Sequence, residues 1–122
     1  MVTRDTAWVP GTPCWVDLSV DSVEKATAFY GALFGWQIED GNVQGGGHIA
    51  NTRFPMGFAP PSSGSREVTV YFRVDDVATY AARVVELGGQ VLDTNDYASG
   101  GGAECIDDQG QRFDLWKPAP GY

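Results

Sequence analysis

The sequence predicts an α+β fold made of two tandem copies of one unit, in which a strand and a helix precede three further strands. An internal repeat is the main observation. Val20-Asp21-Ser22-Val23 recurs as Val74-Asp75-Asp76-Val77, and Leu33-Phe34-Gly35 recurs as Leu87-Gly88-Gly89 at the same spacing. Around each pair of motifs, an apolar strand, an acidic cap, an amphipathic helix and a glycine stop follow in the same order.

The size and composition of the chain support a single folded domain. It has 122 residues, of which 43% are hydrophobic and 20% are charged, which is ordinary for a globular protein. That length accommodates one hydrophobic core and is short for two independent domains. We expect one module over roughly residues 12–60 and a second over roughly 66–118, with a link at 60–65.

The first module is expected to begin with a strand over residues 14–20. Its alternation places Val16, Leu18 and Val20 on one face and Trp15, Asp17 and Ser19 on the other. A helix follows, with Asp21 as its cap and Gly35 as its left-handed end. The apolar stripe of this helix would consist of Ala26, Phe29, Tyr30 and Leu33.

The second module follows the same rules. Its first strand places Val68, Val70, Phe72 and Val74 on one face and Thr69, Tyr71 and Arg73 on the other. Asp75 or Asp76 caps the helix, whose stripe is Tyr80, Ala81, Val84 and Leu87. The last strand, 111–116, buries Phe113 and Leu115 and turns Arg112, Asp114 and Trp116 the other way.

Two glycine-rich segments, 41–47 and 94–102, are expected to be loops, either plain turns or lids. In all three strands, the face away from the helix is polar or aromatic. A sheet with one solvated face would show this alternation. The alternative is a concave face that lines a cavity, which accounts better for the large tryptophan side chains.

Three segments resemble the vicinal oxygen chelate superfamily, which includes glyoxalase I, extradiol dioxygenases, fosfomycin-resistance enzymes and bleomycin-binding (bleomycin-resistance) proteins. They are 29–36 (FYGALFGW), 74–89 and 108–116 (DQGQRFDLW). The resemblance covers roughly residues 12–118. It implies paired βαβββ modules whose strands form a curved mixed sheet, a half-barrel with the helices outside.

The resemblance also implies a divalent metal held by His or Glu on the first and last strand of each module. Transferred position by position, those ligands fall on Trp15, near Gly57, on Thr69 and on Asp114. Indole has no lone pair to donate, and one plausible ligand in four does not hold a catalytic metal tightly. We therefore expect no cofactor. A weakly held metal on His48, Asp114 and Glu104 is the disfavoured alternative.

Without a metal, the predicted site is an aromatic pocket with a few charges. Its expected ligand-binding residues are Trp15, Asp17, Thr69, Tyr71, Arg73, Glu104, Arg112, Asp114 and Trp116. His48, the single histidine, is expected to line the cleft, to reach solvent or to act as a general base. Asp114, His48 and Asp17 are the candidates for catalytic acid–base roles.

Three functions follow from this site. The first is a glyoxalase-like binder of an aromatic or natural-product-type ligand, with a degenerate metal site. The second is a metal-independent isomerase, lyase or cyclase that uses Asp114, Asp17 or His48 to move a proton. The third, which we rank last, is a divalent-metal enzyme of the glyoxalase or dioxygenase type.

Charge and cysteine content limit the partners. A net charge of −8 argues against nucleic acid and against an anionic membrane surface. Two cysteines and no visible signal peptide or membrane-length apolar run indicate a cytoplasmic protein with reduced thiols. The resemblance implies a homodimer as well as a small-molecule ligand.

Overall fold

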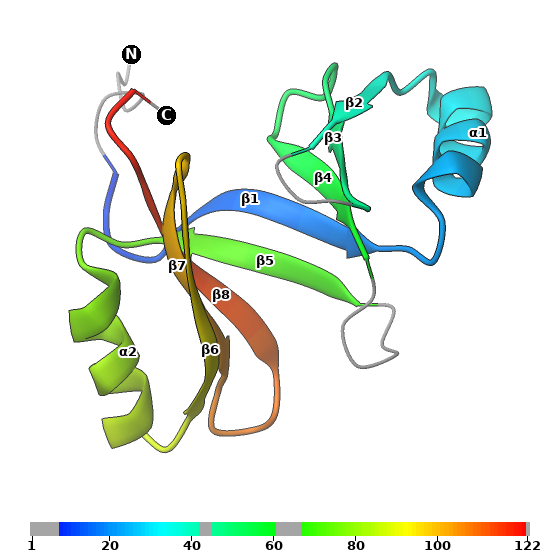
Figure 1. The fold of residues 1–122 in the computed structure, drawn as a ribbon. Coiled ribbons are helices and arrows are strands. Elements are labelled where there is room, and N and C mark those ends of the chain that lie inside the picture. Colours follow the sequence, from blue (N-terminus) through cyan, green and yellow to red (C-terminus); the bar gives the residue numbers. More distant parts are fainter. Residues whose placement is uncertain (1–7, 42–44, 61–66, 122) are drawn as a thin grey trace, which may run out of the picture. The chain divides into compact units, whose positions relative to one another are not determined.

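The computed structural model describes residues 8–41, 45–60 and 67–121, and the chain divides into two compact units (Figure 1). The first unit is Trp15–Val70, and the second consists of Met1–Cys14 and Tyr71–Tyr122. Each is described by itself below. The predicted link at 60–65 and residues 42–44 of the first glycine-rich segment lie almost entirely outside the described residues.

The first unit carries one helix and a four-stranded mixed sheet. In chain order its elements are β1 (Thr12–Ser19), α1 (Val23–Phe34), β2 (Ile38–Asp40), β3 (Gly47–Ile49) and β4 (Met56–Ala59). The strand order is β2-β3-β4-β1. β3 is antiparallel to both its neighbours, whereas β4 runs parallel to β1. β4 begins directly after Pro55.

The second unit repeats this topology with longer strands. Its elements are β5 (Val68–Arg73), α2 (Val77–Glu86), β6 (Gln90–Tyr97), β7 (Gly100–Ile106) and β8 (Arg112–Pro118). The strand order is β5-β8-β7-β6, with β8 parallel to β5 and β7 antiparallel to both its neighbours. The shared order and directions confirm two tandem βαβββ modules of the α+β class.

The capping residues show where each helix begins and ends. The cap of α1 is Ser22, whose Oγ accepts the N–H of Lys25 (3.1 Å), so the prediction of Asp21 was wrong by one residue. Gly35 ends this helix with φ 74°, as predicted. Asp76 caps α2 and accepts the N–H groups of Ala78 and Thr79.

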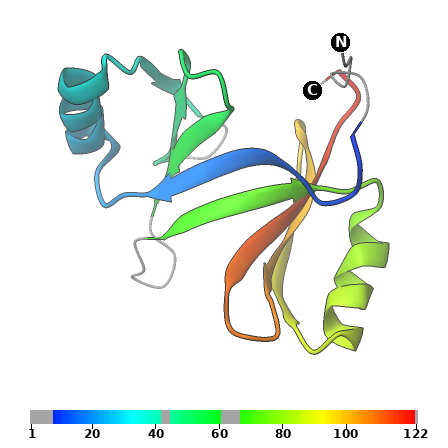
Figure 2. The same cartoon turned by 180° about the vertical axis from the view of Figure 1, so that it is seen from behind.

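Each unit has its own core on the helix side of its sheet. In the first, Ala26 of α1 packs with the buried Ile49 and Phe58, and Tyr30 stacks on Trp36 with ring centroids 5.0 Å apart. In the second, α2 packs against β6, β7 and β8 over a core of Val74, Ala103, Cys105 and Leu115 (Figures 1 and 2). None of the described helices is long and apolar enough to cross a membrane.

Two expectations about these elements were wrong. Phe29 and Leu33 were assigned to the core stripe of α1, but their side chains are 61% and 58% exposed. The segment 94–102 is not a loop, because β6 extends to Tyr97 and β7 begins at Gly100. A Cβ on Gly100 or Gly102 would lie 2.7 or 3.0 Å from the indole of Trp116, so these glycines make room for that ring.

Candidate functional site

The candidate site in the first unit is built on one row of residues that crosses its sheet. Strand pairing places Glu39 of β2 opposite His48 of β3, His48 opposite Gly57 of β4, and Gly57 opposite Asp17 of β1. Directly paired residues project from the same face of a sheet. Glu39, His48 and Asp17 therefore share a face, with the side-chain gap of Gly57 in the middle.

The indole of Trp15 fills that gap. Trp15 lies two residues before Asp17 and projects from the same face of β1. A Cβ on Gly57 would lie only 2.7 Å from Cζ2 of Trp15. The indole N–H donates a hydrogen bond to Oδ1 of Asp17 (2.7 Å), and the ring stacks on His48 with centroids 5.7 Å apart and planes inclined by 22°. These contacts fix the orientation of the ring from two sides.

Glu39 completes the group from the other side of His48. Its Oε1 lies 3.6 Å from Nδ1 of His48, and the two side chains are 67% and 42% exposed. A carboxylate at this nitrogen favours the imidazole tautomer that carries its proton on Nδ1. We call Trp15, Asp17, Glu39 and His48 together the Trp15 platform. Sequence analysis predicted three of its members and missed Glu39.

Thr69, another predicted residue, lies on β5. It is buried, with 8% of its surface exposed. The structure brings Trp15, Asp17 and His48 together.

In the second unit, three of the predicted polar residues lie close together on β7 and β8. Arg112 pairs with Glu104 (3.3 Å), and Asp114 is the direct cross-strand neighbour of Glu104. Asp114 is 4% exposed. The pKa of the Cys105 thiol is raised to about 11, mainly because the thiol is buried and secondly because of the negative charge of Asp114. Cys105 is therefore an unreactive thiol at neutral pH.

The predicted aromatic residues of this unit form a second group. The ring of Trp116 lies 6.3 Å from that of Tyr71 and 6.4 Å from that of Tyr97. Arg73 places its guanidinium carbon 4.4 Å from the ring centroid of Trp8, in a cation–π contact. Tyr97 and Trp8 were not predicted, because the first fell in the expected loop and the second precedes the expected first strand.

The donor set of the first unit does not fit the metal site that the resemblance implies. Neither Trp15 nor Gly57 supplies a ligand atom, and a longer side chain at 57 would collide with the indole and with the carbonyl oxygen of Gly47 (2.8 Å). Thr69 and Asp114 occupy the other two positions at which the resemblance implies a metal ligand. Over residues 8–41, 45–60 and 67–121, no three His, Cys, Asp or Glu side chains converge as metal ligands.

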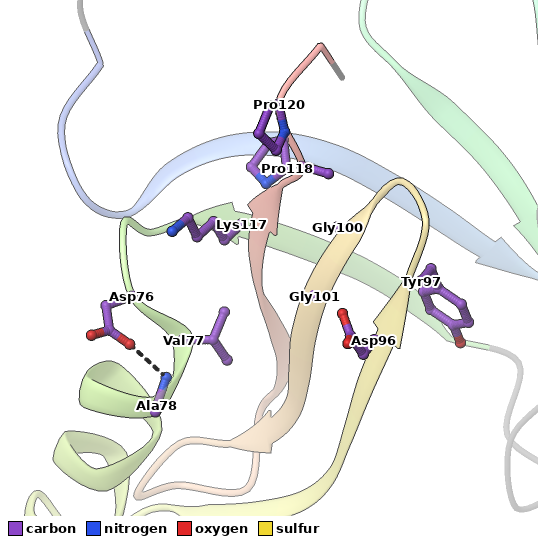
Figure 3. Close-up of a pocket in the computed structure, with 11 residues that line it drawn as sticks. Asp76, Val77, Ala78, Asp96, Tyr97, Gly100, Gly101, Lys117, Pro118 and Pro120 are labelled. Carbon is purple, nitrogen blue, oxygen red and sulfur yellow. Dashed lines mark hydrogen bonds between the residues drawn. The ribbon is translucent and has the colours of Figure 1, made fainter.

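A pocket of about 350 Å³ lies elsewhere in the second unit, and Figure 3 shows it in close-up. It is bordered by the start of α2, the end of β8 and the β6–β7 hairpin. Its lining includes Val77, Gly100, Gly101, Lys117, Pro118 and Pro120. No residue of the predicted site is among its lining residues, but Tyr97, which contacts the ring of Trp116, is one of them.

Comparison with known proteins adds the family relationship. The family model described as "Glyoxalase-like domain" matches residues 15–116. CFP32 of Mycobacterium tuberculosis, named a candidate glyoxylase, is 38% identical over 92 residues, which are 67% of this chain and 35% of that protein. The anthracycline biosynthesis protein DnrV of Streptomyces peucetius is 28% identical over 134 residues, covering 92% of this chain and 49% of that protein.

The chain thus spans between about a third and a half of the length of these relatives. Among solved structures, the methylmalonyl-CoA epimerase of Mycobacterium tuberculosis superposes with a TM-score of 0.64 at 14% identity. The match covers 98% of this chain and 94% of the epimerase. At that identity, the similarity shows a shared fold.

Proposed function

Because this chain belongs to the glyoxalase-like domain family of the vicinal oxygen chelate superfamily, we propose that it binds a small aromatic, natural-product-type molecule without a resident metal ion. The observation that carries the proposal is the Trp15 platform. The indole of Trp15 is held between Asp17 and His48, at the position to which the resemblance transfers the family's first metal ligand. The first unit thereby offers an aromatic surface in place of a metal ligand.

The chemistry of the Trp15 platform favours a planar guest that carries a positive charge. A face of an oriented tryptophan contributes roughly 0.5–2 kcal/mol of stacking or cation–π energy to such a ligand. The carboxylates of Asp17 and Glu39 lie on either side of the stacked rings and would attract a cationic substituent. The name of DnrV points the same way, because anthracyclines are planar aromatic molecules with an amino sugar.

The second unit supplies the other residues that we assign to ligand binding. They are the aromatic side chains Tyr71 and Trp116 and the polar side chains Thr69, Arg73, Glu104, Arg112 and Asp114. Superfamily members bind small-molecule ligands, which supports this class of function. Two further proposals accompany the binding function: a homodimer and a cytoplasmic location.

Binding is tested by titrating the full chain with an anthracycline in the presence of a chelator, using calorimetry or tryptophan fluorescence. Trp15→Ala is expected to weaken binding by roughly 2- to 30-fold, which corresponds to the loss of one stacking contact. Phe54→Ala is the matched control, because Phe54 is an exposed aromatic residue (41%) of the same unit outside the Trp15 platform. Equal affinity of the Trp15→Ala variant and the wild type would contradict the proposal.

A metal-independent enzyme is the second candidate, and the Glu39–His48 pair favours it. A carboxylate at Nδ1 can orient an imidazole so that Nε2 accepts a proton from a bound molecule. Asp17 and Asp114 are the other carboxylates that we propose for proton transfer. To test this role, the ligand is incubated with the protein in D2O in the presence of a chelator. Mass spectrometry then measures the deuterium that the ligand has taken up. Enzyme chemistry predicts deuterium incorporation that His48→Gln abolishes while binding persists.

A further inference from the structure

We propose that the pocket in the second unit, with a volume of about 350 Å³, binds an α-amino acid that has a large apolar side chain. We call it the Gly101 pocket, after the glycine of β7 among its lining residues. The start of α2, the β6–β7 hairpin and residues 117–120 border it (Figure 3). Its volume falls in the range of small-molecule sites, roughly 300–1,000 Å³.

The Gly101 pocket lies on the face of the sheet that α2 covers. Gly101 precedes Ala103 by two residues in β7, and Ala103 belongs to the core against which α2 packs. In β8, Lys117 likewise follows the core residue Leu115 by two residues. Alternate residues of a strand share a face, so Gly101 and Lys117 face the side of α2 while Trp116 projects from the other face. The pocket therefore lies on the opposite side of the sheet from the ring of Trp116.

Gly101 differs from the two glycines beside it, because the fold does not require it. A Cβ on Gly100 or Gly102 would collide with backbone oxygen atoms of β8. A Cβ on Gly101 would meet only the backbone oxygen of Asn95 and Oδ1 of Asp96, both at an ordinary 3.5 Å, and Gly101 has no positive φ. Glycine weakens the interior of a strand and often marks the close approach of a ligand. We therefore assign the open space over Gly101 to a ligand.

Opposite charges flank the open space over Gly101. Strand pairing places Asp96 of β6 and Lys117 of β8 on either side of Gly101, so all three share a face. Because neighbouring strands are about 4.8 Å apart, the Cα atoms of Asp96 and Lys117 are separated by roughly 10 Å. The third charged lining residue, Asp76, already accepts two backbone N–H groups as the cap of α2. A carboxylate and an ammonium group across one gap are complementary to the amine and the carboxylate of an amino acid.

The remaining wall of the Gly101 pocket is apolar and fixed in place. Val77 packs against the core of the second unit. The backbone N–H of Ala119 donates to the carbonyl oxygen of Ser99 (2.9 Å), which ties the end of β8 to the β6–β7 hairpin. Pro118 and Pro120 complete this wall. The apolar side chain of the ligand would contact these residues while its charged groups meet the flanking charges.

Titration of the full chain, followed by NMR, tests the proposal with three probes. They are L-phenylalanine, phenethylamine, which lacks the carboxylate, and hydrocinnamate, which lacks the amine. Lys117→Gln should weaken binding of L-phenylalanine and hydrocinnamate by roughly 2- to 5-fold and leave phenethylamine unchanged. Asp96→Asn should weaken L-phenylalanine and phenethylamine and leave hydrocinnamate unchanged. The control is Lys25→Gln, which removes an exposed lysine of the first unit and should affect none of the probes.

Filling the Gly101 pocket is the second arm of the test. Gly101→Val should weaken L-phenylalanine binding by roughly 10-fold or more, because it places methyl groups in the space assigned to the ligand. Urea unfolding checks that this variant folds, and Gly101→Ala, whose Cβ has room, replaces it if it does not. The proposal is overturned if L-phenylalanine shows no saturable binding at millimolar concentrations, or if a folded Gly101 variant binds it like the wild type. Loss of L-phenylalanine binding in Trp15→Ala would also overturn it, because the probe would then occupy the Trp15 platform.

Discussion

At the scale of single residues, Gly57 decides where the indole of Trp15 can lie. Its missing side chain lets the indole of Trp15 lie across the sheet between Asp17 and His48. The close atoms are Cζ2 of Trp15 at 2.7 Å and the backbone oxygen of Gly47 at 2.8 Å from a Cβ built there. A backbone oxygen cannot swing aside as a flexible side chain can.

Gly57→Ala should therefore destabilise the protein by about 1–3 kcal/mol, the usual cost of overpacking. Gly31→Ala is the matched control, because it lies inside α1 with its nearest neighbour, the Trp36 carbonyl oxygen, at an ordinary 3.5 Å. That substitution should stabilise by about 0.5–1 kcal/mol through helix propensity. Urea unfolding measures both changes. A Gly57→Ala variant as stable as the wild type would show that the indole does not occupy this space.

The sequence located most of the Trp15 platform but not all of it. Trp15 and Asp17 follow from period-two alternation in a clear strand, and the single histidine stood out by its chemistry. Glu39 lies in β2, which is only three residues long and too short to show alternation. Its contact with His48 follows from the register between β2 and β3, which a single sequence does not display.

At the scale of elements, tertiary packing overrode one local signal. A run of glycines disfavours a strand, so 94–102 was expected to be a loop. In the structure, Gly100 and Gly102 form part of β7 because the indole of Trp116 on β8 needs their missing side chains. The helix ends were more predictable, because Gly35 and Asp76 act locally.

The turn between β7 and β8 yields a prediction about acid stability. Hydrogen bonds from the backbone N–H groups of Gln111 and Gln109 lower the pKa of Asp107 below its ordinary 3.8. A carboxyl whose pKa falls on folding stabilises the protein above its unfolded pKa, and the contribution disappears as pH falls through the folded value. Asp107→Asn should therefore flatten the loss of stability as pH falls from roughly 5 toward 2.

Urea unfolding at a series of pH values provides the measurement. Asp108→Asn is the control, because it removes a neighbouring exposed carboxylate of the same turn that accepts neither of these two N–H groups. The control should keep the acid dependence of the wild type. Identical pH profiles for Asp107→Asn and Asp108→Asn would show that the turn does not hold an ionised Asp107.

At the scale of the whole molecule, the repeat gave the topology of both modules. The constant spacing between the motif pairs predicted two copies of one strand–helix–strands unit, and the strand orders β2-β3-β4-β1 and β5-β8-β7-β6 confirm it. The repeat did not predict how the modules differ. Assigning Phe29 and Leu33 to the core of α1 followed from helical spacing alone, which does not tell an inner apolar face from an uncovered one.

The modules also differ in the residues around Gly57 and Asp114. In the first module, aromatic and acidic side chains lie around Gly57, whereas the second has a buried carboxylate, Asp114, on its last strand. Our account is that the first module recognises an organic ligand through Trp15. This account depends on a tryptophan at position 15 and a glycine at position 57.

Native mass spectrometry of the full chain, incubated with an anthracycline and zinc in equal excess and then desalted, tests that claim most directly. We predict a complex with the organic molecule that is strongly reduced in Trp15→Ala and unchanged in Phe54→Ala, with no stoichiometric zinc. One retained zinc ion per chain, together with ligand binding that ignores Trp15, would contradict it.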